Sequence, residues 1–221
     1  MKIKLIISIL YADIPLNNTL NSILTKFGGH MGAFRAAVRK HLDRIPFYRY
    51  GVPIGKDTRI YGWVHLRLEK DSEFQCGKDL TIRSSWKSNP AGGGRTSTQI
   101  RLESGAKLII GDKVGISNTS ICCSTSITIE DNVLIGVNCS ITDTDHHSVR
   151  YEDRINGNKN YKSAPIVIKE GAWIGGHSLI LKGVTIGCRS VIGAGSVVTK
   201  SVPDNELWAG NPAKFIRKIN Q

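Results

Sequence analysis

The chain contains 221 residues, enough for one large domain or two small ones, and its composition is that of an ordinary soluble protein. Its 23 glycines suit a fold with many turns, and its formal net charge of +12 favours an anionic partner such as nucleic acid, membrane phosphates or a phosphorylated small molecule. The apolar run over residues 3–10 is far shorter than the roughly 18 residues of a membrane-spanning helix, which excludes a span there.

The cysteines favour a protein of the reducing cytosol. They are odd in number, and no two of them have the CxxC spacing of a structural zinc site. The start of the chain also lacks the small-residue cleavage site of a secretory signal peptide. We therefore expect a cytoplasmic protein whose cysteines are small packing residues. They are Cys76, Cys122, Cys123, Cys139 and Cys188.

The first fifty residues do not show the repeat that organises the rest of the chain. Apolar residues between 17 and 44 recur with helical spacing, and Pro46 ends the segment. This pattern predicts one or two short helices, the second of them basic. A basic helix can lie on an anionic membrane surface, but its modest apolar face favours packing against the end of the repeat domain. The basic residues of this helix are Arg35, Arg39, Lys40 and Arg44.

A six-residue repeat extends over residues 51–203. Each hexad opens on an aliphatic residue, and its fifth place is small or β-branched. Polar segments at 84–98 and 143–164 interrupt the pattern, and it slips by one residue between Cys122 and Ile129. The two polar segments predict loops that leave the repeat.

The most regular hexads occupy residues 168–203. A period of six does not fit a helix, but it is a multiple of the two-residue alternation of a strand. Each hexad therefore predicts a short strand and a turn, with the first and fifth side chains pointing inward. Stacked hexads bury a continuous ladder and form a solenoid, whereas a β-sandwich is disfavoured because six hexads follow in phase. The predicted inward residues are Ile168, Ala172, Ile174, Ser178, Ile180, Val184, Ile186, Ser190, Ile192, Ser196, Val198 and Val202.

The segment at 143–164 opens with DTDHH, the densest group of titratable residues in the chain. Asp145 falls at an inward place of the repeat, where a charge is unexpected. A histidine beside a carboxylate can act as a general base near neutral pH. His146 and His147 point to opposite sides of an extended chain, so only one of them can face a given cleft. A solvated loop with incidental histidines explains the same residues equally well.

Three stretches together resemble the hexapeptide-repeat acyltransferases: the hexads from Ile168 to Val198, the TDTDHHS cluster, and WAGNPAKFIRK near the end. The sequence is most similar to sugar O-acetyltransferases of the bacterial maltose/galactoside type and to their capsule and exopolysaccharide relatives. The resemblance covers residues 100–221 and is most specific over 165–217. It implies an all-β solenoid, a left-handed parallel β-helix with three hexads to a coil. It also implies a homotrimer with each active site between two subunits.

The expected organisation has three parts. A small, partly helical N-terminal region spans residues 1–50, and the β-helix spans 51–203, with a loop at 84–98 and a protruding loop at 143–164. A basic C-terminal tail over 204–221 leaves the repeat.

The resemblance implies an O-acetyltransferase that moves an acetyl group directly from acetyl-CoA to a sugar hydroxyl. His147 matches the family's catalytic base, which takes the hydroxyl proton. His146, where relatives often carry an aromatic residue, is the second choice for the base. Either Asp143 or Asp145 is expected to orient the imidazole. Asn118 matches an asparagine that the family uses near the acceptor, and Trp173 and Trp208 are expected to pack against the pantetheine arm or the acceptor sugar.

The implied donor site follows the late coils of the β-helix. Gly176 and Ala194 match the places where the pantetheine arm of acetyl-CoA lies against the backbone. Basic side chains at the end of this track suit the adenosine phosphates. The matching residues are Thr199, Lys200, Lys214 and Arg217.

Other functions stay open at this point. Carbonic anhydrases with this fold bind zinc through three histidines, and His146, His147 and His177 are available, although adjacent histidines suit joint ligation poorly. A nucleic-acid binder or scaffold is disfavoured because no nucleic-acid motif occurs. The expected acceptor is a sugar of capsule, lipopolysaccharide or exopolysaccharide synthesis, with serine or a xenobiotic as alternatives. A membrane-linked glycan intermediate would bring the protein to the inner face of the membrane.

Overall fold

The computed structural model describes residues 38–85, 88–89 and 97–220. Contacts divide the chain into a unit of residues 1–45 and a unit of residues 46–221, and each is considered by itself. In the first unit, residues 38–42 are helical, while most of the helices expected over residues 17–44 lie outside the described residues. No helix in the described part of the chain is long and apolar enough to cross a membrane.

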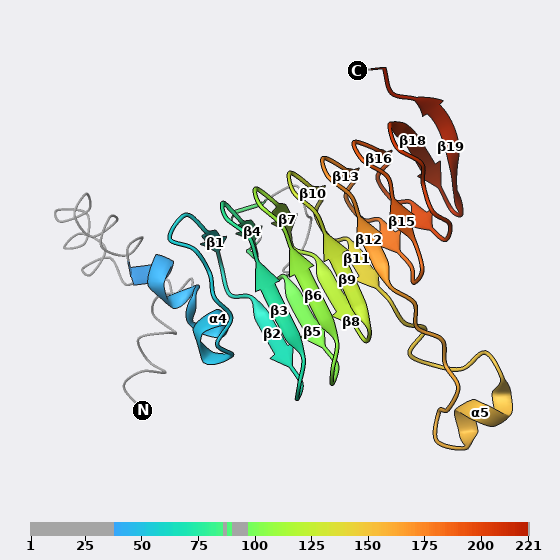
Figure 1. The fold of residues 1–221 in the computed structure, drawn as a ribbon, viewed down its shortest axis with the longest axis horizontal. Coiled ribbons are helices and arrows are strands. Elements are labelled where there is room, and N and C mark those ends of the chain that lie inside the picture. The colour runs from blue at the N-terminus through green and yellow to red at the C-terminus, as the bar shows by residue number, and fades with distance from the viewer. Residues whose placement is uncertain (1–37, 86–87, 90–96, 221) are drawn as a thin grey trace, which may run out of the picture. The chain divides into compact units, whose positions relative to one another are not determined.

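The second unit is a β-solenoid whose coils contribute one strand to each of three parallel sheets, here named A, B and C (Figure 1). Sheet A contains β1 (Arg59–Tyr61), β4 (Thr81–Arg83), β7 (Gly115–Ser117), β10 (Leu134–Ile135), β13 (Trp173–Ile174), β16 (Val191–Ile192), β18 (Glu206–Gly210) and β19 (Ala213–Lys218). Sheet B contains β2 (His65–Leu68), β5 (Gln99–Leu102), β8 (Ser120–Cys123), β11 (Ser140–Thr142), β14 (Leu179–Ile180) and β17 (Val197–Val198). Sheet C contains β3 (Glu73–Cys76), β6 (Lys107–Ile110), β9 (Ser126–Ile129), β12 (Ile166–Ile168) and β15 (Thr185–Ile186).

The core is the ladder of aliphatic residues that the hexads predict. Every predicted inward residue between 168 and 202 is buried, which confirms the inward first and fifth places. The aliphatic residues stack in register, as Ile135, Ile174 and Ile192 do across sheet A. Each such side chain contributes about 1.5–3 kcal/mol by leaving water. The second unit is a left-handed parallel β-helix, as expected, although parallel connections are otherwise almost always right-handed.

The coils narrow toward the C-terminal end. Ten residues separate Ile100 of sheet B from Ile110 of sheet C, and eight separate Ile121 from Ile129 in the next coil. The late hexads need six residues for the same step. The wider early coils explain why the period is clearest in the second half of the sequence.

Helix α4 (Ile45–Arg49) and a C-terminal hairpin complete the solenoid. Phe47 of α4 is fully buried, and its ring lies 6.1 Å from the ring of Phe74. At the other end, β18 pairs in parallel with β16, and β19 folds back antiparallel on β18. The expectation that residues 204–221 leave the repeat was therefore wrong for β18, whereas β19 turns back out of the parallel ladder. Trp208 takes the register of Ile192 and extends sheet A by one more strand.

A loop leaves the solenoid between β11 and β12 and carries the short helix α5 (Tyr151–Ile155), which stands clear of the coils in Figure 1. A bridge between Thr144 and Ser163 closes the base of this loop. Inside it, the Arg154 Nη1 atom donates to the Ser148 carbonyl at 2.8 Å, and the Asn158 Nδ2 atom donates to the His146 carbonyl. These bonds give the loop a defined shape at its base, where the two histidines lie.

Candidate active site

Asp143 is fully buried and holds a corner of the solenoid. Its carboxylate accepts the backbone N–H groups of Ser124, Thr125 and Ser126 at 2.7–2.9 Å, and also the Thr125 hydroxyl at 2.8 Å. The chain leaves the solenoid just after Asp143, so no regular turn follows above this corner to accept those N–H groups. The carboxylate takes that place, and its partners are residues 124–126.

Asp145 is exposed, so the expectation that it occupies an inward place was wrong. Asp143 is the inward carboxylate, because the loop begins two residues earlier than the hexad count indicates. The Asp145 carboxylate lies 2.5 Å from the Lys182 ammonium, and its carbonyl accepts the backbone N–H of His147 at 2.7 Å. Within the described part of the chain, neither carboxylate is hydrogen-bonded to a histidine ring.

His146 and His147 are both exposed at the base of the loop. The His146 ring is 3.3 Å from the Thr142 hydroxyl, and its backbone has a positive φ of 58°. Among the described residues, the ring of His147 has no hydrogen-bond partner. The two side chains thus differ: His146 is tied to its own chain, and His147 is free to meet a substrate.

Asn118 is buried at the turn between β7 and β8, with only 3% of its surface exposed. Its backbone N–H donates to the Arg83 carbonyl at 2.8 Å, but neither its side-chain nitrogen nor its side-chain oxygen has a partner among the described residues. Leaving a buried polar group unpaired costs about 1–3 kcal/mol. Such a side chain is suited to a hydrogen-bond partner from outside the chain.

The predicted site residues fall on two different edges of sheet B. Asn118, Gly176 and Ala194 lie at turns that lead from sheet A into sheet B, here named the A/B edge. His147, Thr199 and Lys200 follow strands of sheet B and lie on the B/C edge. A strand of four residues rises about 13 Å, so one chain does not bring Asn118 and His147 together.

Lys214 and Arg217 lie on neither of these edges. Both are exposed on β19, where Lys214 is opposite Ala209 and Arg217 is opposite Leu207. Ala209 in turn follows Gly193 in register, one residue before Ala194. Lys214 is therefore placed toward the C-terminal end of the A/B edge, whereas Arg217 lies nearer the start of β18, on the side of the turn from sheet C.

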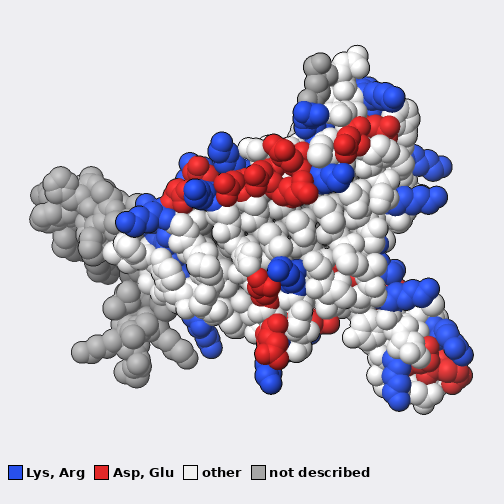
Figure 2. All heavy atoms as spheres, in the orientation of Figure 1, with Lys and Arg blue, Asp and Glu red and all other residues white. Residues whose placement is uncertain are grey.

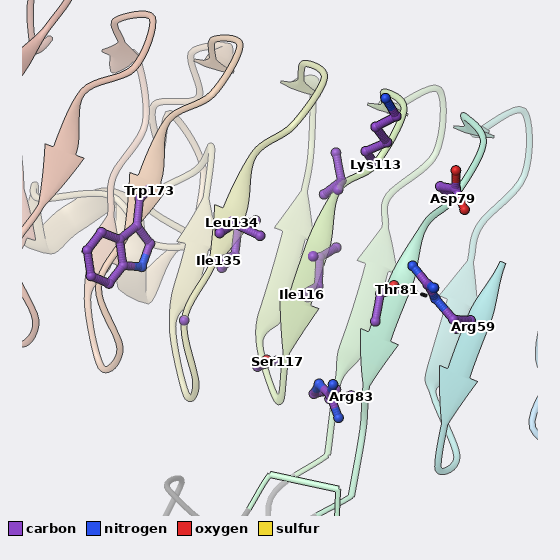
Figure 3. Close-up of a pocket in the computed structure, with 13 residues that line it drawn as sticks. Arg59, Asp79, Thr81, Arg83, Lys113, Ile116, Ser117, Leu134, Ile135 and Trp173 are labelled. Atoms are coloured by element: carbon purple, nitrogen blue, oxygen red, sulfur yellow. Dashed lines mark hydrogen bonds between the residues drawn. The ribbon is translucent and has the colours of Figure 1, made fainter. Parts of the chain in front are cut away.

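Trp173 stands on the outer face of sheet A, beside Leu134 in register, and both side chains are 54% exposed. They form one end of a hollow of about 670 Å³, here named the sheet A groove (Figure 3). The sequence reasoning singled out Trp173 but missed Leu134. Both residues occupy the sixth place of a hexad, which points outward. Aligning the sixth places of successive hexads would therefore have predicted that the two side chains are neighbours.

Many acidic side chains lie along one edge of the solenoid, seen as the band across Figure 2, where basic side chains are interspersed among them. The acidic side chains lie at turns from sheet C into sheet A and cap backbone N–H groups of neighbouring coils, as Asp131 caps Asp112 and Asp204 caps Cys188 at 2.7–2.8 Å. Basic side chains, among them Lys113 and Arg189, lie at the same turns.

Comparison with known proteins agrees with this geometry. Residues 165–200 match the bacterial transferase hexapeptide (six repeats), and residues 126–144 match the hexapeptide repeat of succinyl-transferase. The hexapeptide-repeat-containing acetyltransferase VCA0836 from Vibrio cholerae is 32% identical, with a TM-score of 0.51, over 68% of this chain and 73% of that one. The chain belongs to the hexapeptide-repeat transferases.

Two further relatives show how far this likeness reaches. Galactoside O-acetyltransferase of Escherichia coli (strain K12) is 48% identical over 103 residues, which are 47% of this transferase and 49% of that relative. The chain thus spans about half the length of this curated relative. The product of the Bacillus cereus BC4754 gene is 25% identical, with a TM-score of 0.52, over 76% of this chain and 77% of that one.

The rival zinc function gains no support from the arrangement of one chain. Among the described residues, no three histidine, cysteine or acidic side chains are close enough together to hold a metal ion. His177 lies on the A/B edge, and His146 and His147 lie on the B/C edge.

Proposed function

We propose that this hexapeptide-repeat transferase is an acetyl-CoA-dependent sugar O-acetyltransferase. The observation that carries the proposal is the contrast between two side chains: His147 is exposed and unpaired on a shaped loop base, and Asn118 is buried with an unpaired amide. His147 offers a base, and Asn118 offers a hydrogen-bonding group for a hydroxyl. The names of the relatives from Escherichia coli and Vibrio cholerae support an acetyl group as the one transferred.

We further propose a homotrimer in which the A/B edge of each subunit faces the B/C edge of the next. Head-to-tail contacts of this kind close into a ring when the rotation between copies allows it. Each interface then combines Asn118 and Gly176 of one subunit with His147 and Lys200 of its neighbour. The separation of these residues within one chain supports this arrangement.

The proposed reaction is a single transfer. The His147 imidazole takes the proton of a sugar hydroxyl, and the hydroxyl oxygen attacks the carbonyl carbon of the acetyl thioester. The new C–O bond forms, the C–S bond breaks, and the imidazolium returns its proton to the coenzyme A thiolate. The Asn118 amide holds the hydroxyl or the developing oxyanion.

Acetyl-CoA is proposed to lie along the late coils, with its arm on the small residues Gly176 and Ala194. Thr199 with Lys200, or Lys214 with Arg217, meet its phosphates. On the resemblance alone, we place the acceptor among cell-surface glycans and the protein in the cytoplasm.

The test is acetyl transfer from labelled acetyl-CoA to a panel of glycosides. His147→Ala should lower turnover by about 100-fold or more, as expected for loss of a general base, with the dissociation constant of acetyl-CoA unchanged. His146→Ala is the matched control, because its ring is tied to Thr142. Full activity of the His147 variant would disprove the assigned base, and loss of activity in both variants alike would leave the assignment to His147 unsupported.

A further inference from the structure

The sheet A groove changes character along its length. Its floor is one cross-strand row from Arg59 through Thr81, Gly115 and Leu134 to Trp173. Gly115 creates the hollow, because a Cβ atom there would come within 2.9 Å of the Leu134 Cδ2 atom. The row is therefore apolar and aromatic at one end, open in the middle, and basic at the other end (Figure 3).

At the basic end of the groove, the cationic side chains are held in place by uncharged partners. Arg59 donates through Nε to the Thr81 hydroxyl at 3.2 Å, and Arg83 lies 5.2 Å from the centre of the Tyr61 ring. Lys113 adds a third exposed cation to the lining, which also contains one carboxylate, that of Asp79. In the described part of the chain, none of the three forms an ion pair with a carboxylate. Their partners are uncharged, so the arginine side chains are positioned while their charge stays available.

The groove also leads to the proposed acceptor position. Ser117 lines it, and Asn118 is the next residue along the chain. Arg83 lies beside Ser117 in register, one strand away, and Arg59 is on the strand beyond. Strands are about 4.8 Å apart, so these cations lie about one to two sugar rings from a hydroxyl held at Asn118.

We infer that the sheet A groove binds an acidic oligosaccharide acceptor, with a sugar ring against Trp173 and a carboxylate or phosphate at Arg59 and Arg83. This inference rests on the sugar O-acetyltransferase function proposed above and adds the charge and length of the acceptor. Guanidinium groups bind carboxylates and phosphates through paired N–H donors. An exposed indole offers a flat apolar face to a sugar and an N–H group to its hydroxyls.

Two other occupants fit the groove less well. A second copy of the chain is disfavoured, because the centres of protein interfaces are depleted of charged residues and this groove has three unpaired cations. Coenzyme A is disfavoured because its proposed track follows the late coils, whereas the basic end of the groove lies on the early strands β1 and β4.

The test measures binding by calorimetry at low salt, without acetyl-CoA. The probes are tetragalacturonate, its neutral methyl ester, and maltotetraose with a terminal phosphate. The variant Arg59→Gln/Arg83→Gln is compared with Arg67→Gln/Lys70→Gln, which removes the same charge from side chains already paired with Glu69 and Asp71. Arg59→Gln alone serves if the double variant fails to fold.

Wild type should bind tetragalacturonate or the phosphorylated maltotetraose about tenfold tighter than the neutral methyl ester. Whichever acidic probe binds more tightly identifies carboxylate or phosphate as the recognised group. The groove variant should lose this preference, and the control should keep it. Equal binding of acid and ester, or a preference that survives in the groove variant, would overturn the inference. So would a change in oligomeric state of the groove variant, which would make the groove an interface between copies.

Acetyl transfer to neutral glycosides separates this inference from the proposed function. Transfer without any preference for acids leaves the function standing and removes the groove proposal. Acid binding that depends on the two arginines, without transfer to any sugar, leaves the groove standing and removes the function.

Discussion

Asp143 supports a corner that the repeat itself cannot complete. A buried carboxylate is stable when several N–H groups donate to it, and here three backbone groups and one hydroxyl do so. The sequence showed a slip near this corner and an acidic cluster after it, but not that the two are connected. That connection depends on stacking of residues 124–126 under residue 143, which only the folded coils bring about.

Asp143→Ala should lower the free energy of unfolding by about 3 kcal/mol, because it removes a fully buried carboxylate that accepts three backbone N–H groups and one hydroxyl. Urea unfolding monitored by circular dichroism measures this. Asp145→Ala is the matched control and should cost less than about 1 kcal/mol, since its ion pair with Lys182 is partly exposed. Equal losses in the two variants would show that Asp143 does not have this structural role.

The Cys123 thiol should make the folded protein less stable as the pH rises into the alkaline range. Burial, followed by the neighbouring Asp143, raises the pKa of this thiol from 9.0 to about 12. Burial also raises the pKa of Cys76 to about 12. Between pH 9 and 12 the unfolded chain releases thiol protons that the folded chain keeps. The stabilisation is therefore complete below the unfolded pKa and is lost as the pH rises through the folded pKa.

The measurement is the unfolding free energy of wild type and of Cys123→Ala across this alkaline range. Wild type should lose stability more steeply with pH than the variant does, because the variant lacks one of the thiols whose pKa is raised. Parallel pH profiles would contradict the shifted pKa of Cys123.

The late hexads could be predicted from sequence because every inward place has the same requirement. Each needs a small or aliphatic side chain that packs on the equivalent side chain of the neighbouring coil. The strand β18 could not be predicted in this way. Its inward residue is Trp208, which is neither small nor aliphatic, and the residues around it match the tail of a family rather than a hexad. Only its register with Ile192 shows that it continues the ladder.

Trp208→Ala should therefore destabilise the C-terminal end of the solenoid. The indole packs against the core and donates through Nε1 to the Glu206 carboxylate at 2.7 Å. A loss of about 2–4 kcal/mol is expected for removal of this partly buried ring, measured by thermal and urea unfolding. Ile216→Ala, on the exposed side of the same hairpin, should change stability by less than about 0.5 kcal/mol. A tolerated Trp208 variant would mean that the hairpin contributes little to the fold.

The complete solenoid explains why sequence identified the site residues without showing how they meet. His147 and Asn118 could be proposed separately, one from a break in the repeat and the other from a family likeness. Their positions on opposite edges of sheet B follow from the number of residues in each turn, which the hexad count alone did not establish. The proposed site, which uses both side chains, would therefore be shared between copies.

Mixing two inactive variants tests that arrangement directly. His147→Ala subunits retain Asn118 on the A/B edge, and Asn118→Gly subunits retain His147 on the B/C edge. Glycine is chosen at residue 118 because it accepts the positive φ of 42° there. In a ring of three with one site per interface, every mixed ring contains exactly one interface with both residues intact. Random mixing in equal amounts leaves three quarters of the rings mixed, so activity should recover to about a quarter of the wild-type value.

The subunits are unfolded together in urea and refolded before acetyl transfer is assayed, and each variant refolded alone is the control. Sedimentation should give three times the 24.2 kDa chain mass for all samples. No recovery on mixing would place His147 and Asn118 in the same subunit's site, or would show that only one of them is needed. Recovery toward a quarter requires a shared site, because neither variant chain holds both residues and only an interface between them can restore the pair.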